Sequence, residues 1–225
     1  MPLFVKPKQG LTRQDLHTLL SSHFEGSWFN PSSGVGAGAE HSPYRWNGLT
    51  WQVSGDNATY VNERVVGTQY QAWHFVAQVL DPTQRPDVMP GLRALSWWGA
   101  DEHTWAPQVP LFGGATTLHV SYDDGNCSAR LACRQQLNLP GSMLEFDWNS
   151  AFWVNSAVAK QVYAGKDSAQ GMVASTKQDF ESWVAPLVNQ IVADAQACFT
   201  QSSLQGKGGA DCSKVLDALA VAAGG

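Results

Sequence analysis

The chain has 225 residues, of which 44% are hydrophobic and 15% charged, so it can bury a sizeable core, and its composition argues against disorder. Its net charge of −5 at pH 7 leaves no excess of basic residues for binding nucleic acid or an anionic membrane. No apolar run approaches the roughly 20 residues of a membrane-spanning helix. The N-terminal sequence MPLFVKPKQG has the features of neither a signal peptide nor a transit peptide.

The first predicted element is a helix over residues 12–24. Thr12 is a suitable N-cap, and Asp15 three residues later completes a variant of the capping box. Apolar side chains at helical spacing form one stripe, and the helix is expected to end before Glu25. The Gly/Ser-rich residues 30–39 predict a flexible loop, because they lack the flanking strand and the Gly-Lys-Ser/Thr sequence of a phosphate-binding loop.

Two stretches after this loop have the composition of strands. Residues 49–53 alternate between apolar and polar side chains and lead into a Ser-Gly-Asp-Asn turn. Residues 59–80 are rich in β-branched and aromatic side chains, which favours two strands or one long bent strand. Gly67 lies within this run and is interpreted as a bulge or a kink.

The stretch over residues 92–114, LRALSWWGADEHTWAPQVPLFGG, predicts two buried strands with a polar loop between them. Pro110 lacks a backbone donor, so the second strand should be short or lie at a sheet edge. The loop contains Asp101, Glu102 and His103, the most site-like cluster in the chain. The alternative for this cluster is an ordinary loop that is exposed to solvent.

After these strands the chain is predicted to be mainly helical. Residues 116–120 predict one more short strand, and residues 146–163 a helix that is capped by Asp147 or Asn149. The succession of a helix, several strands and then helices indicates the α+β class, with helices packed on a largely antiparallel sheet.

The longest helix is predicted over residues 175–199, where apolar side chains keep a 3.6-residue period. Ser175 with Gln178 forms a capping box at its start, and Pro186 should kink it. The tail beyond it is rich in glycine and alanine and is expected to be mobile, apart from Cys212 and a short helix over residues 215–221.

The four cysteines fall into two pairs, each close in sequence and in or beside a loop rich in Gly, Ser and Asp. We predict the disulfides Cys127–Cys133 and Cys198–Cys212 among the three possible connectivities. No Cys-x-x-Cys motif and no histidine spacing completes a zinc site, so we expect no metal ion.

Two Asn-x-Ser/Thr sequons, at Asn57 and Asn126, are predicted glycosylation sites. With the paired cysteines they favour an extracytoplasmic protein, either secreted or in a lysosomal or vacuolar lumen. The alternative is a cytosolic protein with four thiols, in which short sequons arise by chance.

The residue patterns alone show no complete catalytic constellation. The serines lack a Gly-x-Ser-x-Gly nucleophile elbow. No histidine lies at metal-binding spacing from another possible ligand. None of the cysteines has a neighbourhood that obviously lowers its thiol pKa. We expect no cofactor.

Five segments nevertheless resemble, in order and spacing, the C-terminal half of the N-terminal-nucleophile (Ntn) dipeptidases, the family of dipeptidase A, to which the secernins are related. The segments are HTLLSSHFEGSWFN, SPYRWNGLTW, NERVVGTQYQAWHFVAQVL, LSWWGADEHTWAPQVPLFGG and FDWNSAFWVNSAVAKQVY. The block ending in VPLFGG and the Glu-Gly-Ser block are the most specific. The resemblance spans residues 10 to 200, which predicts a lead-in over residues 1–10, a dipeptidase-like domain over 11–200 and a tail over 201–225.

The resemblance implies a four-layer αββα sandwich and a cysteine nucleophile at the first position of the processed chain, with its own α-amino group as the base. Arg64 looks like the counterpart of an arginine that lies beside the nucleophile in the wider superfamily, where it would favour a thiolate. The alternative for Arg64 is an ordinary surface ion pair. Glu25, Asp101 and His103 are the expected substrate-binding residues.

Two interpretations follow from the absence of the nucleophile block. In the first, the chain is the C-terminal portion of a dipeptidase, inactive alone and completed by a missing N-terminal half or another polypeptide. In the second, it is a catalytically dead module with a structural or binding role in a larger assembly. In either case we expect one apolar sheet face to be exposed, and hence a partner or self-association as a homo-oligomer. A new nucleophile at Cys127 or Cys133 is disfavoured, because neighbouring aspartates would raise the thiol pKa.

Overall fold

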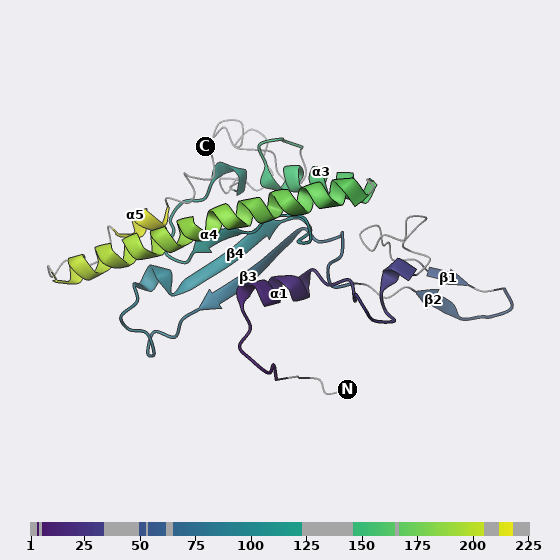
Figure 1. Cartoon of the computed structure of the whole chain (residues 1–225), viewed down its shortest axis with the longest axis horizontal. Helices are drawn as coiled ribbons and strands as arrows, with labels where there is room; N and C mark the ends of the chain where they lie inside the picture. Colours follow the sequence, from purple (N-terminus) through teal and green to yellow (C-terminus); the bar gives the residue numbers. More distant parts are fainter. Residues whose placement is uncertain are drawn as a thin grey trace. The chain divides into compact units, whose positions relative to one another are not determined.

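The computed structural model describes most of the chain (Figure 1). The described residues are 4, 6–33, 50–52, 54–61, 65–122, 146–164, 167–204 and 212–217. The chain divides into two compact units, Met1–Gln69 and Tyr70–Gly225. Four of the predicted site residues lie outside the described residues: Arg64, Asn126, Cys127 and Cys133.

The first unit begins with α1 (Arg13–Leu20), and its predicted capping box is present. The backbone N–H of Thr12 donates to Asp15 Oδ2 at 2.8 Å, and the N–H of Asp15 donates to Thr12 Oγ1 at 3.1 Å. The helix ends earlier than the predicted residue 24. Ser21 is its C-cap, and Phe24 takes a left-handed φ of +59° that a right-handed helix does not accommodate.

A short 3₁₀ turn, η1 (Pro31–Ser33), and an antiparallel hairpin of β1 (Thr50–Gln52) and β2 (Thr59–Val61) complete the regular structure of this unit. The predicted strand at residues 49–53 is thereby confirmed. The turn between the strands contains Gly55 at φ +87°, a conformation that favours glycine.

Gly67 lies outside the strands and packs against the residues that follow α1. Its N–H donates to the carbonyl oxygen of Ser22 at 2.9 Å. A Cβ at this position would lie 2.8 Å from the carbonyl oxygen of Ser21. The close approach of two backbone segments, rather than the predicted bulge, therefore explains this glycine.

The second unit contains a three-stranded antiparallel sheet of β3 (Trp73–Val79), β4 (Ala94–Ala100) and β5 (Val109–Phe112), in that spatial order. The predicted pair of strands around a polar loop is confirmed as β4 and β5. Pro110 lies in β5, which is short and at the sheet edge, as its missing backbone donor requires. The run over residues 59–80 is resolved as two separate strands.

The two faces of this sheet differ in burial, because successive side chains of a strand point to opposite faces. On one face Val76 and Trp97 are buried, and the indole N–H of Trp97 donates to Gln78 Oε1 at 3.1 Å. On the other face Trp73 is 53% exposed and Phe75 is 46% exposed. The sheet thus has a buried face and a half-exposed aromatic face.

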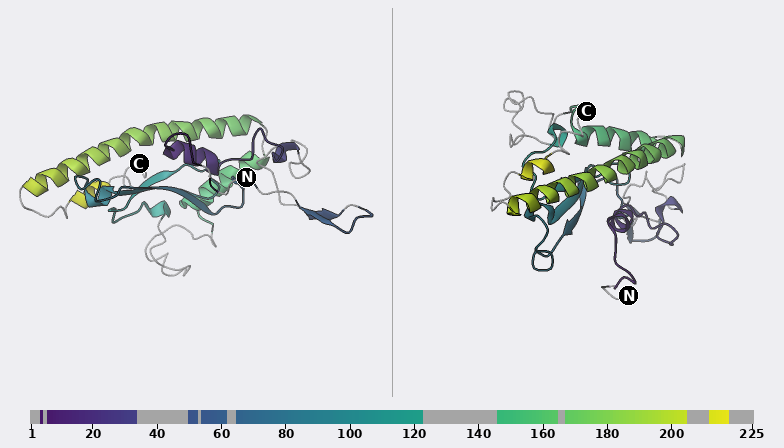
Figure 2. Two further views of the ribbon diagram at one scale, coloured as in Figure 1. Left: turned by 90° about the horizontal axis from the view of Figure 1, so that it is seen from below. Right: turned by 60° about the vertical axis from the view of Figure 1, so that its left-hand side comes forward.

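The buried face is covered by helices. The chain passes through η4 (Pro90–Leu92) and η5 (Val120–Tyr122) before α3 (Ala151–Ala164), α4 (Asp167–Leu204) and α5 (Ser213–Leu216). Figures 1 and 2 show α4 running along one face of the sheet. Its inward side chains form much of the core of this unit: Val184, Val188, Ile191 and Ala195. The protein is therefore a mixed α+β structure in which helices pack on an antiparallel sheet.

The predicted limits of α4 were wrong at both ends. The helix begins at Asp167, so Ser175 lies inside it and its hydroxyl donates to the carbonyl oxygen of Met172 at 3.0 Å instead of capping the helix. At the other end the helix continues past Phe199 to Leu204. It also runs through Pro186 without ending there and curves along its length (Figure 2).

Two further predictions near the sheet were wrong. Residues 116–120 form no strand, because the backbone N–H groups of Thr116 and Thr117 donate to the carboxylate of Asp217. The helix α3 begins at Ala151 rather than at residue 146, because the carbonyl oxygen of Asp147 accepts the N–H of Ser150 in a preceding turn at 3.1 Å.

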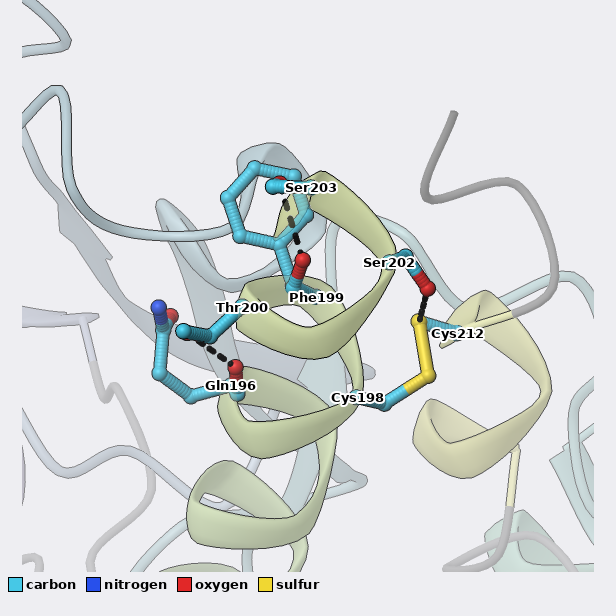
Figure 3. The surroundings of a disulfide bond; sticks show 7 residues. All are labelled: Gln196, Cys198, Phe199, Thr200, Ser202, Ser203 and Cys212. Atoms are coloured by element: carbon cyan, nitrogen blue, oxygen red, sulfur yellow. Dashed lines mark hydrogen bonds between the residues drawn. A yellow bond between two sulfur atoms is a disulfide. The ribbon is translucent and has the colours of Figure 1, made fainter. Parts of the chain in front are cut away.

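The predicted disulfide Cys198–Cys212 is present and joins α4 to α5 (Figure 3). The helix α5 is shorter than the predicted residues 215–221, whose last residues lie outside the described part of the chain. No helix among the described residues is both long and apolar enough to cross a membrane.

Candidate functional site

The loop that follows β4 is strained and buried. Asp101 has a left-handed φ of +70°, and its N–H donates to the carbonyl oxygen of Ala72 at 2.7 Å. Only 7% of Asp101, 2% of Glu102 and 0% of His103 is exposed. The alternative of a solvated loop is therefore wrong. Backbone strain in a buried acidic loop is a feature of functional sites, because the surrounding structure has to maintain it.

Glu102 stabilises a tight turn in this loop through two hydrogen bonds. Its Oε1 accepts the N–H of Thr104 at 2.8 Å, and its carbonyl oxygen accepts the N–H of Ala106 at 3.0 Å. The carboxylate thus acts as a local cap for the turn, in the manner of an N-cap acid.

His74 lies beneath the loop, on the buried face of β3. Its Nδ1 bonds to the carbonyl oxygen of Asp101 at 3.1 Å, which requires the proton on Nδ1. Its ring centroid lies 4.9 Å from that of His103. Burial lowers the pKa of His74 to about 4, and the charges of His103 and Lys177 act in the same direction, so this imidazole is neutral at pH 7.

Gly99 makes room for this histidine. It is the cross-strand partner of His74, and a Cβ on Gly99 would lie 2.2 Å from His74 Cε1 and 2.3 Å from Nε2. Real Cβ atoms do not approach other atoms so closely, so the position requires glycine while His74 keeps this rotamer.

Three other elements hold the loop in place. The Nζ of Lys177, on α4, donates to the carbonyl oxygens of His103 and Thr104 at 2.9 and 3.0 Å. Asn155 Nδ2, on α3, donates to the carbonyl oxygen of Ala100 at 3.0 Å. The ring of His103 bonds through Nδ1 to Gln71 Oε1. The loop is therefore anchored to both long helices and to the residues before β3.

The carboxyl group of Asp101 has a perturbed pKa. Burial raises its pKa to about 6. The N–H of Glu102, the positive charge of Lys160 and a hydrogen bond with Ser156 limit this rise. Near neutral pH the group is mostly ionised but close to its titration range, which suits it to bind a positively charged ligand group.

Glu25, another predicted substrate-binding residue, belongs to the first unit. Its Oε2 accepts the N–H of His23 at 3.0 Å, and its Oε1 lies 3.1 Å from His23 Nδ1. His23 is 2% exposed and Glu25 61%. The carboxylate thus stabilises its own turn while keeping an exposed side, and its role in substrate binding stays a prediction.

Two further predictions concern modification and metal binding. Asn57 is exposed in the turn between β1 and β2, and its glycosylation stays a prediction. Among the described residues, no group of three His, Cys, Asp or Glu side chains is placed to hold a metal ion.

The model of Peptidase family C69 matches residues 1–179, most of the chain. The chain belongs to peptidase family C69. This is the family of the dipeptidase A-type cysteine dipeptidases, so the resemblance of the five sequence segments is confirmed. Neither the curated proteins nor the solved structures contain a significant match to this chain. The C69 match includes the whole sheet, the loop after β4 and Lys177, and it ends within α4.

Sequence reasoning missed two residues of this candidate site. His74 follows Trp73 in a strand, so strand alternation alone puts it on the face opposite an exposed tryptophan. Lys177 is the only cation on α4. A single lysine in an otherwise uncharged or acidic helix indicates a specific partner, but the sequence does not show that this partner lies more than 70 residues away.

Replacing Lys177 with methionine should loosen the loop. The change keeps the length of the side chain but removes both hydrogen bonds to the carbonyl oxygens of His103 and Thr104, at a cost of about 2–3 kcal/mol in the free energy of unfolding. Chemical denaturation measures this cost, and Gln178→Met, at an exposed neighbouring position on α4, is the matched control. If the two variants have equal stability, Lys177 does not hold the loop.

Proposed function

We propose that this protein acts in the hydrolysis of dipeptides, as part of a cysteine-type Ntn peptidase. Membership of family C69 over residues 1–179 carries the proposal. The strained and buried loop after β4 supports it, because it offers a carboxylate of raised pKa on a rigid frame of two helices and a sheet.

Asp101 is the residue we assign to the substrate. A dipeptide carries a free α-ammonium group, and a carboxylate that burial has deprived of water gains most from such a partner. His103 lies in the same loop, is enclosed and is bonded to Gln71, and it keeps its proposed role in substrate binding. Glu25 and Arg64 keep their proposed roles in substrate binding and beside the nucleophile.

We place the nucleophilic cysteine in polypeptide beyond these 225 residues. Cys198 and Cys212 are joined in a disulfide, so neither can supply a thiolate in this state. The family mechanism uses a cysteine at the start of the processed chain, whose own amino group accepts the thiol proton. The predicted domain limits at residues 10 and 200 belong to the same proposal.

The half-exposed face of the sheet supports a missing layer. The rings of Trp73 and Trp98 are stacked, with centroids 5.1 Å apart and an angle of 12° between their planes. The ring centroids of Phe75 and Trp98 are 6.2 Å apart. Trp73 and Phe75 are about half exposed, and a contiguous exposed apolar face of this kind marks a surface that packs against another layer or partner. A second sheet on this face would produce the αββα sandwich.

The 225-residue chain by itself is expected to show no turnover in an assay against a panel of dipeptides. Material isolated from the natural source should instead contain additional polypeptide with an N-terminal cysteine, detected by intact mass measurement, and should hydrolyse dipeptides until its thiols are alkylated. Turnover by the chain alone that survives thiol alkylation would refute the proposed nucleophile. Natural material with neither an N-terminal cysteine nor turnover would favour the catalytically dead module.

A further inference from the structure

The disulfide lies in a part of the chain that the family match does not cover. The match ends at residue 179, whereas Cys198 lies near the end of α4 and Cys212 just before α5 (Figure 3). The two Cα atoms are 5.8 Å apart, and the cysteines are separated by 14 positions in the sequence. Cys212 is completely buried, whereas Cys198 is half-buried. Membership of the family therefore does not account for this link.

The disulfide anchors α5, and α5 in turn holds the segment after β5. The carboxylate of Asp217 accepts hydrogen bonds from the N–H and hydroxyl of Thr116, both at 2.7 Å, and from the N–H of Thr117 at 3.1 Å. Leu216 is 2% exposed and lies so close to Gly91 that a Cβ there would be 2.9 Å from its Cδ1. A helix of four residues is not stable alone, and the disulfide is the covalent link that ties this helix to α4.

An apolar pocket, partly open to solvent, lies between these elements. Phe180 and Trp183 of α4 line it together with Leu216 of α5. The segment after β5 contributes Thr117 and Tyr122, and burial raises the pKa of Tyr122 to about 12, so its phenol is neutral. Two walls of this pocket, α4 and α5, are thus the two helices that the disulfide joins.

We propose that the Cys198–Cys212 disulfide is a redox-controlled clasp for this pocket. In the disulfide form, α5 holds residues 116–117 in place and the pocket keeps its walls. Reduction by a dithiol releases α5, and the segment after β5 then separates from it. The proposal concerns the control of the pocket and is independent of the hydrolytic function.

A dithiol can reduce this disulfide by thiol–disulfide exchange. A thiolate of the dithiol attacks the sulfur of Cys198, the less buried of the two residues, and the S–S bond to Cys212 breaks, leaving a Cys212 thiolate that takes up a proton. The second thiol of the reagent then displaces Cys198 from the mixed disulfide. The products are two protein thiols and the cyclic oxidised reagent, so two electrons and two protons pass to the protein.

Amide hydrogen exchange on the full chain tests the clasp. The amides of Thr116 and Thr117, which donate to Asp217, should exchange at least about tenfold faster after reduction with dithiothreitol, whereas amides of the β3–β4 ladder should not change. The double variant Cys198→Ser/Cys212→Ser should show the fast exchange without reductant. The matched control Cys127→Ser/Cys133→Ser should keep the full response to reductant.

A variant at the other end of the clasp makes the test independent of cysteine chemistry. Asp217→Asn keeps the disulfide but weakens the three hydrogen bonds, so the same two amides should exchange faster with or without reductant. Unchanged exchange at Thr116 and Thr117 after reduction overturns the proposal. An equal acceleration in the β3–β4 ladder also overturns it, because the disulfide would then stabilise the whole unit rather than the pocket wall.

Discussion

Gly99→Ala is expected to lower the free energy of unfolding by about 3 kcal/mol. The new Cβ would lie 2.2 Å from the ring of His74, which is 5% exposed and bonded to the carbonyl oxygen of Asp101. The ring cannot move aside without breaking that bond and displacing His103, whose ring is 4.9 Å away. Overpacking at this point therefore propagates into the loop after β4. Chemical denaturation of the full chain gives the value.

Two variants separate this clash from the general effect of replacing a glycine. Gly10→Ala is the matched control, because a Cβ at Gly10 meets nothing within 4 Å, and it should leave the stability unchanged. The variant His74→Ala lacks the clash partner. Gly99→Ala should therefore cost less stability in the His74→Ala background than in the wild type. If Gly99→Ala is as stable as Gly10→Ala, the packing of His74 on Gly99 is not as described.

Asp101→Asn is expected to stabilise the protein at pH 7 by up to about 3 kcal/mol. Burial raises the folded-state pKa of Asp101 from 3.8 to about 6, so the ionised group opposes folding at neutral pH. Asparagine is nearly isosteric, carries no charge and tolerates the left-handed φ of +70° at this position. A stability gain at a residue assigned to the substrate is the usual trade-off of a functional site.

The pH dependence gives the sharper test, because Asp101 and His74 act in opposite directions. The contribution of Asp101 is fully present below pH 3.8 and is lost as pH rises through about 6. His74 has a folded-state pKa lowered from 6.5 to about 4, so its contribution is present above pH 6.5 and is lost as pH falls through about 4. In the wild type the two effects nearly cancel between pH 4 and pH 6.5.

Removing the Asp101 titration should therefore expose that of His74. Asp101→Asn should lose about 3 kcal/mol of stability between pH 6.5 and pH 4, a change that the wild type largely lacks. Denaturation curves over this range measure it, with Asp194→Asn, at an exposed position on α4, as the control. If Asp101→Asn and the wild type have parallel stability profiles, the carboxyl group does not titrate as described.

Interactions between residues close in the sequence were sufficient to predict several structural features. The capping box of Thr12 and Asp15 and the missing donor of Pro110 act within a few residues of the chain, so their structural effects were predictable. Cys198 and Cys212, close in sequence, were predicted to pair and do so. The family resemblance was also readable from short segments, because they follow one another in order and at family-like spacing.

Competing contacts, near or distant in the sequence, explain the predictions that failed. The stretch over residues 116–120 has the composition of a strand, but its amides bond to Asp217, about 100 residues later in the chain. Ser175 has the sequence of an N-cap, but the preceding residues are helical as well, so its hydroxyl bonds back to Met172 inside the helix. Intrinsic propensity is weak enough that such contacts override it.

The sequence by itself determined the family, the two strands around an acidic loop and the pairing of Cys198 with Cys212, since each depends on residue types at short spacing. Only the tertiary structure decided that this loop is buried, that His74 lies beneath it and that Lys177 reaches it from α4. Burial and pKa shifts arise from groups that are distant in the chain but close in space. The raised pKa of Asp101, the property that recommends it for binding an ammonium group, is therefore a property of the fold.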